Sequence, residues 1–171
     1  MHTTNDKPII RFYTDGSCRT NPGPGGYGVL MLIDGWEVTK EYSEHCDSTT
    51  NNREELKAII KALEAATSLL EEMPNTFDKI YIYSDSAYCV NMCNDWIWTW
   101  ARNDWKNSKK KVVENVDLVH TLYKYLNKDF FNCQVEIRKV KGHVGIWENE
   151  YVDALATGDE KKKKLLLSQQ P

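Results

Sequence analysis

A chain of 171 residues with 41% hydrophobic and 27% charged residues has the composition of an ordinary globular protein. No apolar run approaches the roughly 20 residues that a membrane-spanning helix needs, and the polar segment 1–7 lacks the apolar core of a signal peptide. The five cysteines, an odd number without a Cys-x-x-Cys pair, indicate reduced thiols and not a disulfide framework or a zinc site. We therefore expect a single cytoplasmic domain without membrane attachment.

The net charge of −3 gives no support for a nucleic-acid partner, but the distribution of the charge does. Five basic residues lie within residues 102–111, opposed only by Asp104, and a second basic cluster lies at 138–141. Local basic patches can bind phosphates even on an acidic protein.

The first part of the chain has the pattern of consecutive β-strands. Apolar and β-branched runs predict strands at 8–15, 29–33 and 36–44. A turn rich in proline and glycine at 21–26 separates the first two strands, and Asp34-Gly35 is a hairpin signal. Short loops between consecutive strands favour an antiparallel arrangement of all three.

A long amphipathic helix follows this meander. It opens after Thr49, and apolar residues recur at helical spacing from Leu56 to Leu70. The next strand is predicted at 79–84. A strand, a helix and a strand in succession form a crossover connection, so this fourth strand should run parallel to the first.

The second half of the chain alternates between helix and strand. Residues 86–105 are predicted to be helical with one break, followed by a lysine-rich protrusion or loop at 106–111. A helix around 116–126, a fifth strand around 135–140, a loop at 141–145 and a helix from about 148 complete the pattern. A four-lysine run and a polar end predict that residues 158–171 form a mobile basic tail.

Two of the predicted strands end on an aspartate in similar surroundings, Tyr13-Thr14-Asp15 and Tyr83-Ser84-Asp85. In neighbouring parallel strands these carboxylates would lie about 5 Å apart at the edge where α/β sheets bind ligands. Two carboxylates that close repel each other unless a cation or a shared proton compensates. Taken alone, either acid is more often a turn former or a helix cap.

Two further acids, Glu55 and Asp153, are candidates for the same site. Glu55 lies on the shoulder of the apolar stripe and should point to the sheet, whereas Glu54 should point to solvent. The sequence pattern alone does not place Asp153, which lies among apolar neighbours in the last predicted helix. A site of carboxylates without a cysteine or histidine cluster suits Mg²⁺ or Mn²⁺.

Several motifs in order resemble those of the type 1 ribonuclease H family, over about residues 8–157. They are Thr14-Asp15-Gly16-Ser17-Cys18, the segment 21–28, Thr50-Asn51-Asn52-Arg53-Glu54-Glu55-Leu56, Ser84-Asp85-Ser86, and Lys141-Gly142-His143-Val144-Gly145 with Glu148-Asn149-Glu150 and Asp153. The resemblance implies an α/β fold with a five-stranded mixed sheet, in which strands 1–3 are antiparallel and strands 4 and 5 are parallel to strand 1, flanked by helices on both faces.

The resemblance also implies an activity and a cofactor. It implies an endoribonuclease that hydrolyses the RNA strand of RNA–DNA hybrids with two Mg²⁺ ions, Mn²⁺ being possible, and leaves 3′-hydroxyl and 5′-phosphate ends. It assigns metal binding to Asp15, Glu55, Asp85 and Asp153, and proton transfer with product departure to His143.

By the same resemblance, residues 8–157 are the catalytic domain, and 96–111 form a basic substrate-binding protrusion. The implied substrate-binding residues are Asn21, Thr50, Asn51, Asn52, Trp96, Trp100, Trp105, Lys106, Lys109, Asn115 and Asn149. The chain departs from the family pattern at Ala87 and Ser48, where many or some members carry longer polar side chains. These departures predict weaker hybrid affinity with unchanged chemistry.

Three alternatives stay open beside a free-standing monomeric enzyme. Met1 and the absence of a polymerase region disfavour a reverse-transcriptase fragment, but a domain excised from a polyprotein fits the sequence. A DNA strand transferase of related fold is disfavoured by the asparagine cluster suited to 2′-hydroxyls. A catalytically dead hybrid-binding module is disfavoured because all four acids are present.

Overall fold

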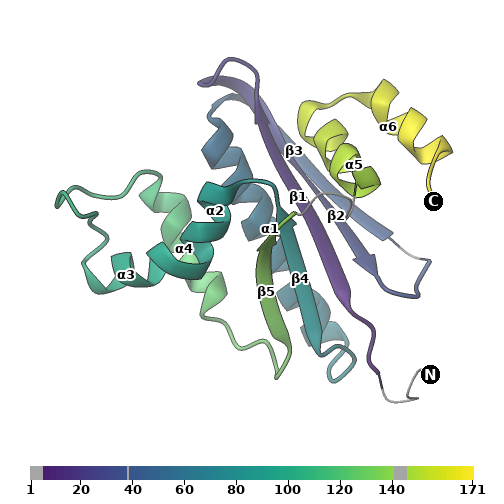
Figure 1. The fold of residues 1–171 in the computed structure, drawn as a ribbon, viewed down its shortest axis with the longest axis horizontal. Coiled ribbons are helices and arrows are strands. Elements are labelled where there is room, and N and C mark those ends of the chain that lie inside the picture. Colours follow the sequence, from purple (N-terminus) through teal and green to yellow (C-terminus); the bar gives the residue numbers. More distant parts are fainter. Residues whose placement is uncertain (1–5, 38, 141–145) are drawn as a thin grey trace.

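One mixed sheet organises the computed structural model, which describes residues 6–37, 39–140 and 146–171 (Figure 1). The strand order is β3-β2-β1-β4-β5. The strands are β1 (Ile10–Cys18), β2 (Gly23–Ile33), β3 (Thr39–Thr49), β4 (Lys79–Ser84) and β5 (Gln134–Lys139). The first three strands pair antiparallel, and β4 and β5 run parallel to β1. The predicted topology is therefore confirmed.

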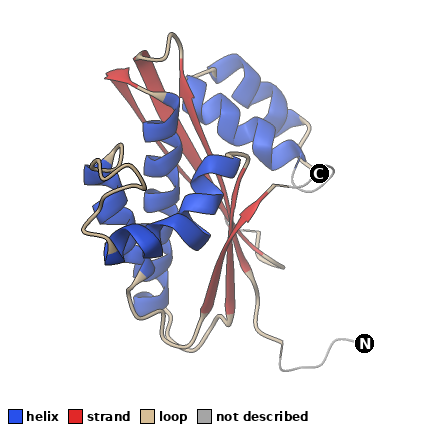
Figure 2. Ribbon diagram, turned by 60° about the vertical axis from the view of Figure 1, so that its left-hand side comes forward, coloured by secondary structure: helices blue, strands red, loops and turns tan. Residues whose placement is uncertain are grey.

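Helices cover both faces of the sheet (Figure 2). The helices are α1 (Asn51–Glu72), α2 (Ala87–Asn91), the π-helical turn η1 (Met92–Trp96), α3 (Ile97–Arg102), α4 (Val116–Leu126), α5 (Ile146–Thr157) and α6 (Glu160–Ser168). On one side α1 lies against the sheet with α4 beside it, and on the other side α5 lies on β1 and β2 with α6 outside it.

The alternation of side chains along β1 builds a core on each face of the sheet. Phe12 belongs to the larger cluster, together with Leu56 of α1 and Ile82 of β4. Tyr13 belongs to the smaller cluster, together with Val152 of α5. Successive residues of a strand point to opposite faces, so one strand supports both layers.

The structure differs from the prediction at the start of β2. The expected turn at 21–26 is shorter, because β2 already begins at Gly23, which pairs with Thr49. A register shift between Gly23 and Gly25 marks an irregularity in this pairing. Cross-strand partners thus extend a strand into a segment whose local composition favours a turn.

The C-terminal segment also differs from the expected mobile tail, because residues 160–168 form α6. Asp159 caps this helix by accepting a hydrogen bond from the Lys162 N–H at 3.0 Å. The indole Nε1 of Trp147 donates to the Leu166 carbonyl at 2.8 Å, and Leu166 packs against the cluster that contains Tyr13. Capping and these long-range contacts order a segment whose own sequence shows no helical stripe.

Two smaller predictions can be compared with the structure. All five cysteines are free, and Cys89, Cys93 and Cys133 are buried. Within the described residues, no helix combines the length and apolar character needed to cross a membrane.

Candidate active site

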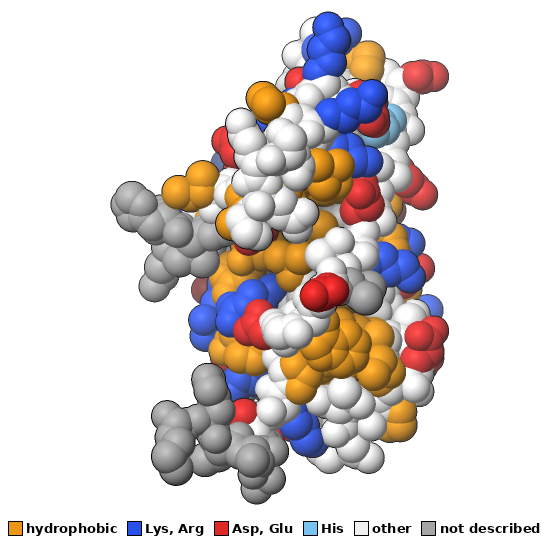
Figure 3. All heavy atoms as spheres, turned by 90° about the vertical axis from the view of Figure 1, so that its right-hand side faces the viewer, with side chains coloured by type: hydrophobic (Ala, Val, Ile, Leu, Met, Phe, Trp, Pro, Cys, Tyr) orange, Lys and Arg blue, Asp and Glu red, His pale blue; other side chains and the backbone are white. Residues whose placement is uncertain are grey.

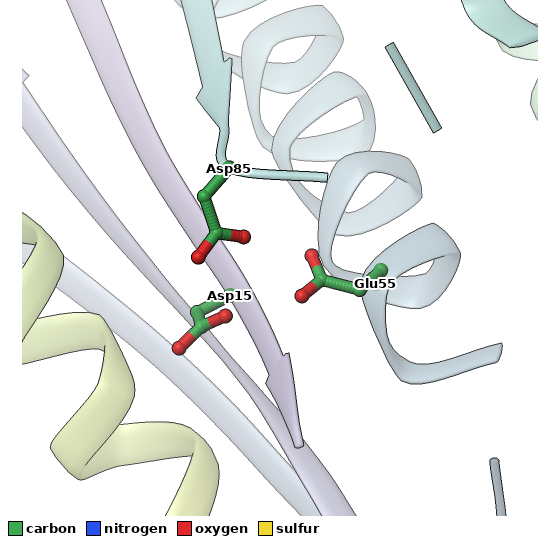
Figure 4. Close-up of side chains that lie close together, drawn as sticks. All are labelled: Asp15, Glu55 and Asp85. Carbon is green, nitrogen blue, oxygen red and sulfur yellow. The ribbon is translucent and has the colours of Figure 1, made fainter. Parts of the chain in front are cut away.

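Three carboxylates meet where the parallel pairing of β1 with β4 ends, although β1 itself continues to Cys18 (Figure 4). Asp15 comes from β1, Asp85 follows β4, and Glu55 comes from the first turn of α1. One oxygen atom from each of these side chains lies within 4.8 Å of the other two. The structure thus brings together three of the four acids that the sequence singled out.

The register of the central strands makes Asp15 and Asp85 neighbours. Tyr13 pairs with Tyr83 across β1 and β4, so the two aspartates follow at equivalent positions. The Thr14 hydroxyl donates to the Tyr83 carbonyl at 2.8 Å, which ties the strand ends together. Both aspartates are therefore held by backbone that is buried and hydrogen-bonded.

A close approach between β1 and α1 delivers Glu55. A Cβ atom on Gly16 would lie 2.3 Å from the Glu55 backbone nitrogen, so only a glycine lets the helix start this near the strand. Thr50 caps the helix, and its Oγ1 accepts from the Arg53 N–H at 3.3 Å. The glycine and the cap together set the position of the first helical turn.

The expected orientation of Glu54 is wrong. Its side chain is 2% exposed, and its Oε2 lies 2.8 Å from the Lys57 ammonium. The same oxygen accepts from the Thr49 hydroxyl at 2.7 Å. At the first turn of α1 the end of β3 also covers the helix, so both adjacent glutamates are buried, towards different partners.

The three carboxylates are electrostatically strained. Burial, and then the nearby charge of Asp85, raise the pKa of Asp15 well above its ordinary value. Burial, and then the charge of Asp15, raise the pKa of Glu55 even more strongly. Clustered, partly buried oxygen donors of this kind fit a hard divalent cation, which would relieve the repulsion.

Asp153 approaches this cluster from α5 but does not belong to the group within 4.8 Å. Its Oδ2 accepts a hydrogen bond from the Lys162 ammonium at 2.7 Å. The negative charge of Asp153 still contributes to the raised pKa of Asp15, so the two carboxylates are near each other. The hydrogen bonds from Lys162 to Asp153 and Glu150 raise the pKa of Lys162, which keeps it protonated.

The polar residues expected to contact substrate gather around the starts of α1 and α4. The Asn21 side-chain oxygen accepts from the Asn51 N–H at 2.9 Å, so these two residues lie together. Asn51 and Asn52 are exposed, and Thr50 is half-buried. Asn115 is the N-cap residue of α4.

Arg53 connects the two helix starts and was not predicted to have a role. Its guanidinium donates to Asn115 Oδ1 at 3.2 Å and forms a two-pronged pair with Asp117 at 3.0 and 2.7 Å. The only sign of a role in the sequence was its position between Asn52 and Glu54 in the motif. Its partners could not be predicted, because they lie more than sixty residues further along the chain.

The tryptophan and lysine segment projects from the body of the molecule at α3 (Figure 1). Trp96 and Trp100 are half-buried and contact each other, with ring centroids 6.1 Å apart. Trp105 packs edge-on against Tyr123 of α4 at 5.1 Å, so much of its surface serves packing. Lys106 and Lys109 are exposed.

Two predicted site residues remain. His143 lies outside the described residues. Asn149 lies in α5 and is half-buried.

The fold and this cluster define a class of α/β protein with a candidate metal site at the carboxyl ends of parallel strands. The RNase H family model matches residues 7–160. The chain therefore belongs to the RNase H family, and it is a ribonuclease H enzyme.

Individual relatives agree with this assignment. A ribonuclease H of Legionella pneumophila (strain Lens) is 44% identical over 147 residues, which cover 86% of this chain and 93% of that protein. A ribonuclease H of Chlorobium chlorochromatii is 43% identical over 157 residues, covering 91% and 98%. The crystal structure of LC9-RNase H1, a type 1 RNase H with the type 2 active-site motif, superposes with a TM-score of 0.67 at 31% identity, covering 90% of this chain and 72% of that one.

Proposed function

We propose that this enzyme hydrolyses the RNA strand of RNA–DNA hybrids internally, leaving 3′-hydroxyl and 5′-phosphate ends. The observation that carries the proposal is the cluster of Asp15, Glu55 and Asp85 within 4.8 Å, on a chain of the RNase H family. A solved relative in the same fold, LC11-RNase H1, is described in complex with an RNA/DNA hybrid.

We assign metal binding to the three clustered acids and to Asp153. Two bound Mg²⁺ ions, or Mn²⁺ in their place, would activate a water nucleophile and stabilise the departing oxygen. Asp15, Glu55 and Asp85 present clustered oxygen donors, of which Glu55 is buried and Asp85 is exposed, and their mutual repulsion favours a cation. Asp153 would contribute a half-buried carboxylate from α5, which packs on β1 and β2.

His143 is proposed to donate a proton to the leaving oxygen and to assist product departure. A neutral-range pKa makes histidine suited to that exchange. In sequence it lies just before α5, the helix that carries Asp153.

Substrate binding is proposed to combine groove contacts and phosphate contacts. Asn21, Asn51 and Asn52 present amides beside the cluster, and amides can hydrogen-bond 2′-hydroxyls without reading sequence. Thr50 and Asn115 are the N-cap residues of two helices whose starts Arg53 holds together, and helix N-termini attract phosphate. Arg53 acts here as a positioning residue.

The protrusion and α5 are proposed to extend the contact area. Trp96 and Trp100 would face the DNA strand, Lys106 and Lys109 would attract its phosphates, and Asn149 would meet the RNA strand. Trp105 would support this surface from beneath, since its ring packs on Tyr123.

A DNA strand transferase is the second candidate, because it would use the same acids. The exposed amides of Asn51 and Asn52 beside the cluster favour the hybrid as the substrate.

We also propose that residues 8–157 form the catalytic domain and that the enzyme works as a monomer in the cytoplasm. Five free cysteines fit a reducing compartment.

A cleavage assay tests this function. The protein should cut a labelled RNA–DNA hybrid in the presence of Mg²⁺ and spare duplex DNA and duplex RNA. Asp15→Asn should reduce the rate by at least about a thousandfold while preserving the circular dichroism spectrum. Asp34→Asn is the matched control, because Asp34 pairs with Arg11 near the start of β1, away from the cluster. This variant should cleave the hybrid at the wild-type rate. Cutting of duplex DNA, or full activity of Asp15→Asn, would refute the proposal.

A further inference from the structure

One lysine of the C-terminal helix is directed at the candidate metal site. The Lys162 ammonium lies 2.7 Å from Asp153 Oδ2 and 2.7 Å from Glu150 Oε2. Lys162 therefore neutralises two acids one helical turn apart on α5. It is the cation that the described structure places on the carboxylate of Asp153.

The ammonium is held there by the docking of the whole helix. The Asp159 cap fixes the backbone of Lys162, and the bond from Trp147 to the Leu166 carbonyl anchors the far end of α6. The next residue, Lys163, pairs with Glu41 of β3 at 2.9 Å. A lysine on a free tail would sample many positions, but this one is restrained on both sides.

We propose that Lys162 is a built-in counter-ion that withholds the Asp153 carboxylate from the metal site until a divalent cation displaces it. This inference rests on the proposed function, because it takes Asp153 as the fourth metal-binding acid. It also goes beyond the family pattern, since the family model ends at residue 160.

The physical reason is competition for one carboxylate. An ammonium on Asp153 Oδ2 takes up negative charge that would otherwise attract a divalent cation, and its positive charge also repels a cation bound nearby. Removing the ammonium should therefore strengthen metal binding. By linkage, metal binding should loosen the contact between α6 and α5 to the same degree.

The first experiment measures metal binding without substrate, by titrating MnCl₂ and MgCl₂ in a calorimeter. Lys162→Met keeps most of the aliphatic stem and should tighten binding by about fivefold or more, the lower end of coupling between linked sites. Lys163→Met is the matched control, because it removes an equivalent ion pair of the same helix that does not touch the site, and its affinity should be that of the wild type.

A double substitution identifies the carboxylate involved. Asp153→Asn should weaken metal binding, and Lys162→Met should tighten binding much less in that background than in the wild type, because only the repulsion by the ammonium charge then remains. Lys162→Gln is the second variant if Lys162→Met does not fold. In the wild type, hydrogen exchange of residues 160–168 should rise when metal is added.

The outcomes separate the two proposals. If Asp153→Asn binds metal like the wild type, the fourth-ligand assignment fails and the inference fails with it. If Asp153→Asn weakens binding but Lys162→Met and Lys162→Gln do not tighten it, Lys162 only anchors α6; the metal site stands and the counter-ion role is refuted. Unchanged exchange of α6 on metal addition would refute it as well.

Discussion

Glu54 and Glu55 are adjacent in sequence, and both are buried, yet their surroundings differ. Glu54 is neutralised by Lys57 and receives a hydrogen bond from Thr49, so its negative charge is stabilised. Glu55 faces Asp15 and Asp85, so its negative charge is opposed. Burying a carboxylate with partners supports the fold, whereas burying one against other carboxylates supports a cation site.

The raised pKa of Glu55 predicts how the stability of the metal-free protein depends on pH. The folded state holds a proton that the unfolded chain releases, so the free energy of unfolding should fall as pH rises from about 4.5, the ordinary value of the group. Glu55→Gln removes this loss. In EDTA at pH 8 the free energy of unfolding of this variant should be roughly 1–2 kcal/mol higher than that of the wild type, and the difference should vanish near pH 4.

Urea unfolding at several pH values measures this effect. Glu54→Gln is the matched control: it leaves Lys57 without a charged partner and should be less stable than the wild type at pH 8. A Glu55→Gln protein less stable than the wild type at pH 8 would contradict the raised pKa.

At the scale of elements, the site depends on how closely β1 and α1 approach each other. Gly16 allows this contact, because an added Cβ would meet backbone atoms of Glu54 and Glu55 at 2.4 and 2.3 Å. The obstacle is backbone, which cannot swing aside as a side chain could. The distance between the strand and the helix therefore sets the distance between Asp15 and Glu55.

Gly16→Ala should push the first turn of α1 away from β1. We expect a loss of about 1–3 kcal/mol in stability from overpacking. We also expect a fall of about a hundredfold in hybrid cleavage, from misplacement of Glu55.

Gly35→Ala provides the comparison for Gly16→Ala. Gly35 has a φ of +80° and no atom near its added Cβ, so it should lose about 1–2 kcal/mol from backbone strain alone and keep its cleavage rate per folded molecule. Thermal unfolding and initial rates measure both variants. Equal activity of the two would show that the approach at Gly16 does not position Glu55.

For the whole molecule, the net charge of −3 conceals a separation of charge. Basic and acidic side chains adjoin one another on the face at the α6 side (Figure 3). The protrusion instead exposes the lysines of 106–111 away from the acidic cluster. This separation allows an acidic protein to bind a polyanion through a local basic surface.

Hybrid binding should therefore depend steeply on salt. Cleavage at subsaturating hybrid should fall at least about tenfold between roughly 50 and 200 mM KCl, at constant Mg²⁺, because phosphate contacts release counter-ions. Replacing Lys109, Lys110 and Lys111 together by alanine should flatten this slope. Lys79→Ala, at the opposite end of β4 from Asp85, should leave it unchanged. Insensitivity of the wild type to salt would contradict the proposed role of the protrusion.

Local patterns in the sequence determined most of the architecture. The apolar stripe from Leu56 to Leu70 and the strand at 79–84 imposed the crossover, and the crossover alone makes Asp15 and Asp85 neighbours. The apolar periodicity of a helix or strand and the handedness of a strand–helix–strand connection depend on short segments of the chain, so both can be predicted from the sequence. The family motifs then pointed to the same acids.

The tertiary structure alone decided which partner each charged side chain has. Glu54 is buried because the end of β3 covers it, and the segment after residue 158 is helical because Trp147 and Glu41 hold α6. The same docking places Lys162 on Asp153. These partners lie on separate elements of the fold, and no local pattern encodes a pairing that forms only when those elements pack together.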